Sequence, residues 1–232
     1  MGKAYAFTDL HGQYDLWKQI RDYCQPDDTL YFLGDACDRG PEGIKIIKEL
    51  LTDPRVTYLK GNHEEMLEVT AAEMLEGDMS GVQLWAENGG MDTWTELMCE
   101  PDAIVKEIIS KLKKLPLTAT YTSPQGKTFY MSHSGSYSPI EYTYRGKWIK
   151  VDPDADCLWD RSHLDIQTWS DEYPDDYIIH GHSPVQNFFK SDIPTAYCEG
   201  HKIDLDVASF VTKKVYLYDL DEMTIAAEFK SE

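Results

Sequence analysis

Carboxylate and guanidinium side chains stand together directly after a short apolar run in this chain. Asp35, Asp38 and Arg39 lie in the stretch 34–40, which follows the strand-forming residues 30–33. In an open α/β sheet, ligands bind beyond the carboxyl ends of the strands. A simple turn made from Asp and Gly is the alternative interpretation. The residues at the other strand ends therefore decide whether this stretch carries chemistry.

Metal-ligand residue types follow five separate strand candidates. They are Asp9 with His11, Asp35 with Asp38, Asn62 with His63, His133, and His182. Because the ends of strands in one sheet, or in two stacked sheets, meet in space, we expect these side chains to form one cluster. Carboxylate, imidazole and amide oxygen together suit divalent ions such as Mn²⁺, Fe²⁺ or Zn²⁺. In Asp-x-His, the alternation of side chains along an extended segment would place both groups on one side.

The N-terminal part of the chain predicts the sheet that positions these residues. We expect strands over residues 3–8, 29–33 and 56–59, and helices over residues 13–23 and 42–51. Pro41 can open the second helix at its first position. Alternating strands and helices imply right-handed crossovers and a largely parallel sheet.

The remainder of the chain predicts a helical insertion followed by a second sheet. Residues 62–116 indicate two or three helices that overhang one end of the sheet, with Met and Trp residues interpreted as packing. A hairpin over residues 117–132 ends at His133, an irregular piece spans residues 136–173, and a buried strand covers residues 177–179. Residues 215–218 and 224–229 resemble antiparallel strands that close the second sheet. We expect one domain over residues 1–232.

The charge balance restricts the class of partner. The 232 residues include 41 acidic and 22 basic ones, for a formal charge of −19. This acidity argues against nucleic acid and an anionic membrane as partners, because both require a basic face. It would also repel an anionic substrate unless cations lie in the site. Five widely spaced cysteines suggest neither a disulfide framework nor a structural zinc site, so we expect reduced thiols and a cytoplasmic protein.

The ordered set of motifs resembles the PPP-type phosphoprotein phosphatases of the calcineurin-like metallophosphoesterase superfamily, in particular the small bacterial and phage members. The matching residues are DLHG at 9–12, GDACDRG at 34–40, GNHE at 61–64, His133, and Gly181 with His182. The resemblance covers most of the chain. It implies an α/β fold with two stacked mixed β-sheets flanked by helices, with the helical insertion around residues 64–116.

The same resemblance implies a centre of two divalent metal ions, with Mn²⁺ expected first and Fe, Zn or Ni as alternatives. The implied ligands are Asp9 and His11 for the first ion, Asp35 as the bridge, and Asn62, His133 and His182 for the second. Such a pair of ions can acidify a shared water and hold the phosphoryl oxygens during in-line attack. By resemblance, His63 protonates the leaving oxygen and is oriented by Asp38. Arg39 and Arg161 would bind the phosphate.

Two departures from the family pattern and one additional histidine need interpretation. Thr8 stands where the family usually has a small residue, and residues 203–208 replace a common Ile-Asp-Thr-Gly-Ala pattern. We expect neither to touch the metal ligands, although the second can reshape the substrate rim. His180 is interpreted as structural or as a neighbour of the ligands, because the resemblance puts the ligand after the glycine, at His182.

The expected function is metal-dependent phosphomonoester hydrolysis, with phosphoserine or phosphothreonine in a protein as the first substrate class and phosphotyrosine as a further one. The first alternative is a symmetrical bis(5'-nucleosyl)-tetraphosphatase or another small-molecule phosphoesterase. That nucleotidase branch typically has Ala-Arg-Gly and Gly-Asn-His-Asp where this chain has Asp38 and Glu64, which favours the phosphatase. The second alternative is a non-catalytic phospho-binding module, and the intact His63, Asp38 and Arg39 speak against it.

Overall fold

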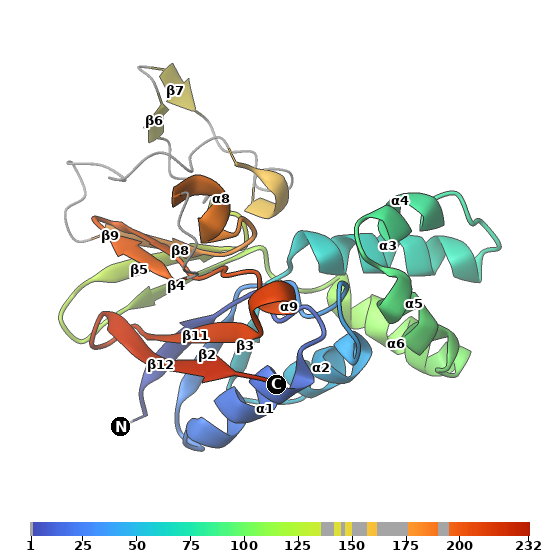
Figure 1. Cartoon of the computed structure of the whole chain (residues 1–232), viewed down its shortest axis with the longest axis horizontal. Coiled ribbons are helices and arrows are strands. Elements are labelled where there is room, and N and C mark those ends of the chain that lie inside the picture. The colour runs from blue at the N-terminus through green and yellow to red at the C-terminus, as the bar shows by residue number, and fades with distance from the viewer. Residues whose placement is uncertain (1, 136–141, 145–146, 150–156, 162–175, 190–194) are drawn as a thin grey trace.

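Two mixed β-sheets of five strands each lie one on the other (Figure 1). The structure is a computed structural model that describes residues 2–135, 142–144, 147–149, 157–161, 176–189 and 195–232. The first sheet is made of β1 (Ala4–Phe7), β2 (Thr29–Phe32), β3 (Val56–Tyr58), β11 (Lys214–Asp219) and β12 (Thr224–Lys230). Its order is β12-β11-β1-β2-β3. The pairs β1–β2 and β2–β3 are parallel, as expected, and β11 joins β1 in antiparallel orientation.

The second sheet places the later motifs above the first. It is made of β4 (Thr118–Thr122), β5 (Thr128–Ser132), β8 (Asp176–His180), β9 (Tyr197–Glu199) and β10 (Lys202–Asp204). Its order is β4-β5-β8-β10-β9, and β8 pairs in parallel with both β5 and β10. The carboxyl ends of β5 and β8, which precede His133 and His182, therefore lie at the same edge.

Side-chain alternation along the strands separates two apolar layers. In β1, Tyr5 and Phe7 belong to the core formed with the helices, whereas Ala4 and Ala6 belong to the layer between the sheets. The helices α1 (Tyr14–Tyr23) and α2 (Gly43–Leu50) contribute to the first layer through residues spaced at helical intervals. The expected α/β fold with stacked mixed sheets is confirmed.

The helical insertion contains four helices rather than the two or three expected. They are α3 (Asn62–Leu75), α4 (Val82–Glu87), α5 (Met91–Met98) and α6 (Asp102–Leu112), and they lie beside the stacked sheets in Figure 1. The breaks expected near Gly77 and Gly89 do separate α3 from α4 and α4 from α5. None of the helices in the described ranges has both the length and the apolar character that a membrane span needs.

Three expectations for individual elements are wrong. Helix α2 begins at Gly43 rather than at Pro41, because Glu42 adopts a left-handed conformation with φ of 66°. Strands β11 and β12 extend the first sheet, not the second. The piece expected to be irregular contains a short ribbon of β6 (Tyr142–Tyr144) and β7 (Lys147–Ile149), while most of residues 136–173 lies outside the described residues. Two short helices, α8 (Val185–Phe189) and α9 (Ser209–Thr212), complete the described elements.

Candidate active site

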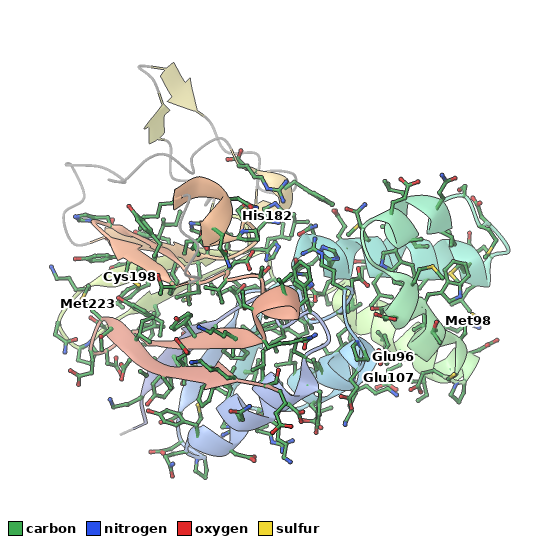
Figure 2. All side chains as sticks on the ribbon, viewed as in Figure 1. Glu96, Met98, Glu107, His182, Cys198 and Met223 are labelled. Atoms are coloured by element: carbon green, nitrogen blue, oxygen red, sulfur yellow. The ribbon has the colours of Figure 1, made fainter. Side chains whose placement is uncertain are left out.

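The predicted strand-end residues converge on one buried cluster. All eight are at most 5% exposed, and they come from both sheets and from the first turn of α3. His182, labelled in Figure 2, lies at the end of the second sheet that faces the helical insertion. The members are Asp9, His11, Asp35, Asp38, Asn62, His63, His133 and His182.

Asp35 lies at the centre of this cluster. Its Oδ1 is 3.3 Å from His133 Nε2, and its Oδ2 is 3.6 Å from His11 Nε2 and 3.8 Å from His63 Nε2. Two groups of candidate metal ligands share this carboxylate, His11–Asp35–His63 and Asp35–His133–His182, with all ligand atoms of each group within 4.8 Å of one another. Asp35 therefore lies between the two groups, which is the placement that the bridging role implied by the resemblance requires.

Asn62 completes the second group. Its Oδ1 is 2.9 Å from His133 Nε2 and 2.9 Å from His182 Nδ1. A carbonyl oxygen has two lone pairs and can accept from both imidazoles. Asn62 thus lies beside the group of Asp35, His133 and His182, and one carboxylate, one amide oxygen and two imidazoles are a donor set suited to a borderline divalent ion.

The backbone conformation that brings Asp9 and His11 together differs from the extended segment expected. They are not part of an extended segment, because their φ angles are 51° and 43°. Two left-handed residues in a turn bring Asp9 Oδ1 within 3.7 Å of His11 Nε2. The other oxygen, Asp9 Oδ2, accepts the backbone N–H of His182 at 3.1 Å. Gly181 is needed beside this carboxylate, because a Cβ at that position would lie 2.0 Å from Asp9 Oδ2.

Backbone strain is concentrated in the site. Ten non-glycine residues in the described ranges have a positive φ, and six of them are predicted site residues. Asp and His tolerate the left-handed region better than most residues, and such conformations cluster at functional sites. The six are Asp9, His11, Asp35, Asp38, Arg39 and His182.

The imidazole hydrogen bonds test whether the cluster suits metal ions. His11 Nδ1 donates to the carbonyl of Cys37 at 2.9 Å, and His133 Nδ1 donates to that of Leu33 at 2.8 Å. Each bond orients Nε2 toward the cluster, as is usual for metal-binding histidines. Within the described residues, the buried atoms Asp9 Oδ1 and His182 Nε2 have no hydrogen-bond partner. Oriented imidazoles and unpartnered buried acceptors fit divalent ions.

The protonation states follow from burial and from the shared carboxylate. Burial would raise the pKa of Asp35, but the imidazoles of His133 and His63 outweigh it and hold that pKa well below its usual range. Burial would lower the pKa of His133, but the Asp35 carboxylate raises it to about 10. Burial and the charge of His133 lower the pKa of His182 to about 2. Burial, together with nearby carboxylates, raises the pKa of Asp9. An added cation would therefore displace protons.

The expected catalytic pair is formed. His63 Nδ1 lies 2.7 Å from Asp38 Oδ2, and both side chains are fully buried. The opposite nitrogen, His63 Nε2, has no hydrogen-bond partner among the described residues and points toward Asp35 at 3.8 Å. An imidazole fixed by a carboxylate can hold a proton at Nε2 and deliver it to a leaving group.

The two predicted phosphate-binding arginines flank the cluster. Arg39 Nη1 lies 2.8 Å from His11 Nε2. That nitrogen has a single lone pair, so it can accept from Arg39 or bind a metal ion, but not both. An ion held by His11 Nε2 would therefore require Arg39 to give up this contact. Arg161 Nε donates to Ser183 Oγ at 3.0 Å, next to His182.

Glu64 ties the two central motifs together beneath the site. Its Oε2 accepts the backbone N–H groups of Asp35 and Gly61, each at 2.8 Å. Its Oε1 accepts Ala36 N–H at 2.7 Å and the Tyr58 hydroxyl at 2.8 Å. One carboxylate thus fixes the end of β2 against the start of α3.

Sequence reasoning missed several residues of the site. Thr8 does touch a predicted ligand, because its hydroxyl donates to Asp9 Oδ2 at 2.5 Å, so the expectation that it would not is wrong. The Phe210 ring lies 5.0 Å from Arg39 Cζ and packs edge-on against His11. Trp85 Nε1 donates to Asp38 Oδ2 at 2.9 Å. None of these contacts has a periodic signal in the sequence. The interpretation of His180 is supported, since His182 rather than His180 meets Asn62.

Comparison with known proteins decides the family. The profile of the calcineurin-like phosphoesterase family matches residues 2–209. The chain belongs to this family. It is 30% identical to serine/threonine-protein phosphatase 2 of Escherichia coli over 77% of this chain and 78% of that protein. It is 27% identical to a symmetrical bis(5'-nucleosyl)-tetraphosphatase of Delftia acidovorans over 56% of this chain and 43% of that protein.

A solved structure agrees with the fold. The protein serine/threonine phosphatase of Saccharomyces cerevisiae superimposes with a TM-score of 0.60, covering 100% of this chain and 80% of its own, at 15% identity. At that identity the likeness concerns the fold alone. The family match and the buried groups of candidate metal ligands identify this metallophosphoesterase as a metal-dependent hydrolase of phosphoesters.

Proposed function

We propose that this metallophosphoesterase is a phosphoprotein phosphatase that acts on phosphoserine or phosphothreonine. The observation that carries the proposal is the buried pair of His63 and Asp38, with Nδ1 and Oδ2 2.7 Å apart. A pure binding module would not need a fixed proton donor. The nucleotidase branch typically has Ala at the position of Asp38. The E. coli phosphatase, aligned over 77% of the chain, supports the same choice.

The chain supplies ligands for two divalent ions, and we propose Mn²⁺ for both. Asp9 and His11 would hold the first, and Asp35 would be shared by both. Asn62, His133 and His182 would hold the second. When bound, such ions acidify water and neutralise charge on the phosphoryl group. They also give an acidic protein a local positive site for an anionic substrate.

The protein's own groups carry the remaining steps. His63 donates its Nδ1–H to Asp38, and the negative charge of that carboxylate favours a second proton at Nε2, which would pass to the leaving serine or threonine oxygen. Arg39 and Arg161 offer planar forks for the nonbridging phosphate oxygens. His63 and Asp38 are fully buried, which strengthens the interaction between them.

A symmetrical dinucleoside tetraphosphatase is the second candidate, and the Delftia acidovorans relative favours it. Trp159 adds a structural observation, because its indole is 40% exposed and lies edge-on to His182 with ring centroids 6.2 Å apart. An exposed aromatic face next to a phosphate site can stack on a nucleobase.

Hydrolysis by metal-stripped protein, with and without added Mn²⁺, separates the two candidates. The substrates are a phosphoserine peptide and diadenosine tetraphosphate. We expect Mn²⁺-dependent phosphate release from the peptide and little nucleotide cleavage. Cleavage of the nucleotide with an inert peptide would overturn the substrate assignment while leaving the metal centre intact.

The acid role of His63 has its own test. We expect His63→Ala to lose most turnover on the phosphoserine peptide and much less on p-nitrophenyl phosphate, whose leaving group needs no protonation. Equal losses on both substrates would refute the role.

A further inference from the structure

The helical insertion reaches the catalytic pair through one indole. Trp85, in α4, donates its Nε1–H to Asp38 Oδ2 at 2.9 Å. The same oxygen accepts His63 Nδ1–H at 2.7 Å. Within the described residues, the other oxygen, Asp38 Oδ1, is buried without a hydrogen-bond partner. Both of these side-chain hydrogen bonds are therefore accepted by Asp38 Oδ2, and Trp85 donates one of them.

The indole itself is held in place. Trp85 is 1% exposed, and its ring stacks on that of Trp94 with centroids 6.4 Å apart and an interplanar angle of 9°. Gly90 lies against the indole, and a Cβ at that position would come within 2.4 Å of Trp85 Nε1. A rigid donor loses little rotamer entropy when it fixes its acceptor, so it can set the carboxylate orientation.

The insertion makes further contacts with the segment 38–44, which contains Asp38. The backbone N–H of Asp38 donates to Thr93 Oγ1, and that of Arg39 donates to the carbonyl of Gly89, each at 2.8 Å. The Glu96 carboxylate, labelled in Figure 2, accepts the N–H of Gly43 at the start of α2. The insertion thus holds residues 38–44 through backbone groups and the catalytic carboxylate through Trp85.

We propose that Trp85 is a positioning residue that fixes the Asp38 carboxylate toward His63. This inference rests on the acid role of His63 proposed above. Without the indole N–H, Asp38 keeps only one side-chain donor and can turn its free oxygen. His63 then loses its fixed orientation toward the leaving oxygen. Hydrolysis of a substrate whose leaving group needs no proton is then affected much less.

The test compares Trp85→Phe with Trp94→Phe in the metal-loaded protein. Trp85→Phe keeps an aromatic ring and removes the N–H, while Trp94→Phe makes the same change in the stacking partner. For Trp85→Phe we expect kcat on the phosphoserine peptide to fall about tenfold, the worth of one hydrogen bond to a charged group, and kcat on p-nitrophenyl phosphate to fall less than about threefold. Trp94→Phe should preserve the ratio of the two rates.

A double-mutant cycle distinguishes positioning from general packing. In an Asp38→Asn background, Trp85→Phe should cost less than about twofold further on the peptide, because the two residues act as one unit. Additive losses, or equal losses on both substrates, would overturn the proposal. If Trp85→Phe lowers the melting temperature or metal content, benzothienylalanine at position 85 keeps the shape of the ring system without the N–H and must give the same substrate-selective loss.

His63→Ala in the same experiment distinguishes a failure of the Trp85 proposal from a failure of the acid role of His63. If His63→Ala shows the substrate-selective loss and Trp85→Phe does not, the role of Trp85 is wrong and the acid role stands. If His63→Ala itself lacks the selective loss, the acid role is refuted and the positioning role falls with it.

Discussion

Replacing Glu64 by Gln should destabilise the fold beneath the metal site. The Glu64 carboxylate is fully buried and accepts four hydrogen bonds, two on each oxygen. A Gln side chain keeps one acceptor oxygen and turns the other into an NH₂ group. With the amide oxygen facing the N–H groups of Asp35 and Gly61, the NH₂ faces Ala36 N–H and the Tyr58 hydroxyl. The hydroxyl can rotate and accept, whereas the backbone N–H of Ala36 cannot.

The size of the effect follows from this count. One buried backbone donor left without an acceptor costs about 1–3 kcal/mol, and the remaining bonds lose their charge assistance. Burial and the neighbouring Asp35 raise the pKa of Glu64, so a neutral amide recovers part of the cost of burying the charge. We expect the free energy of unfolding to fall by about 2 kcal/mol on balance.

Urea unfolding followed by circular dichroism measures this change. The metal-free protein should be used, because bound ions would add their own stabilisation to the difference. Glu65→Gln is the matched control, since Glu65 is the next residue on α3 and, among the described residues, accepts only the indole N–H of the half-exposed Trp159. We expect the control to change the free energy of unfolding by less than about 0.5 kcal/mol. A Glu64→Gln effect no larger than that of the control would refute the reasoning.

Three further predictions concern metal and substrate binding. Asp35→Asn removes the carboxylate that both ligand groups share, so bound Mn²⁺ measured by mass spectrometry should fall to well below that of the unchanged protein; full retention would contradict the bridging role. Because the Asp35 carboxylate raises the pKa of His133 to about 10, His133 holds a proton at neutral pH, and metal binding should release protons and tighten as the pH rises toward 10. Calorimetry in buffers of different ionisation heat detects the released protons. Metal binding without proton release would contradict a ligand role for His133. Phe210→Ala removes the ring that lies 5.0 Å from Arg39 Cζ, and should raise KM about two- to tenfold with kcat nearly unchanged; a matching rise for Phe210→Tyr would contradict a cation–π role.

The cluster of candidate metal ligands could be predicted because its placement depends on local strand formation. Runs such as residues 4–7 and 29–32 form parallel neighbours, and the chain leaves each strand at the same edge. The ligand-type residues just beyond these strands, Asp9 and Asp35, then enter one cluster. The angle at which Asp9 and His11 meet was not predictable in this way. It depends on left-handed φ values, which no alternation of apolar residues encodes.

The last two strands show a second limit of periodicity. The apolar pattern of β11 identifies a strand, but it does not say which sheet the strand extends. In the structure Val215 and Leu217 face the helical layer, and Tyr218 faces the layer between the sheets. An antiparallel strand with two apolar faces can join either sheet edge, and the choice of β1 as partner depends on long-range packing.

The burial of Trp85 in the insertion can be predicted from the sequence, but its hydrogen bond to Asp38 cannot. Leu84 and Trp85 are neighbours on α4, yet Leu84 is 63% exposed and Trp85 is 1% exposed. Helical spacing can identify the buried position, and a buried indole N–H requires an acceptor. Which acceptor it finds depends on how the insertion docks against residues 38–44, and that information lies in contacts between distant segments. A change at the exposed Leu84 leaves this hydrogen bond in place, whereas a change at Trp85 acts on the Asp38 carboxylate directly.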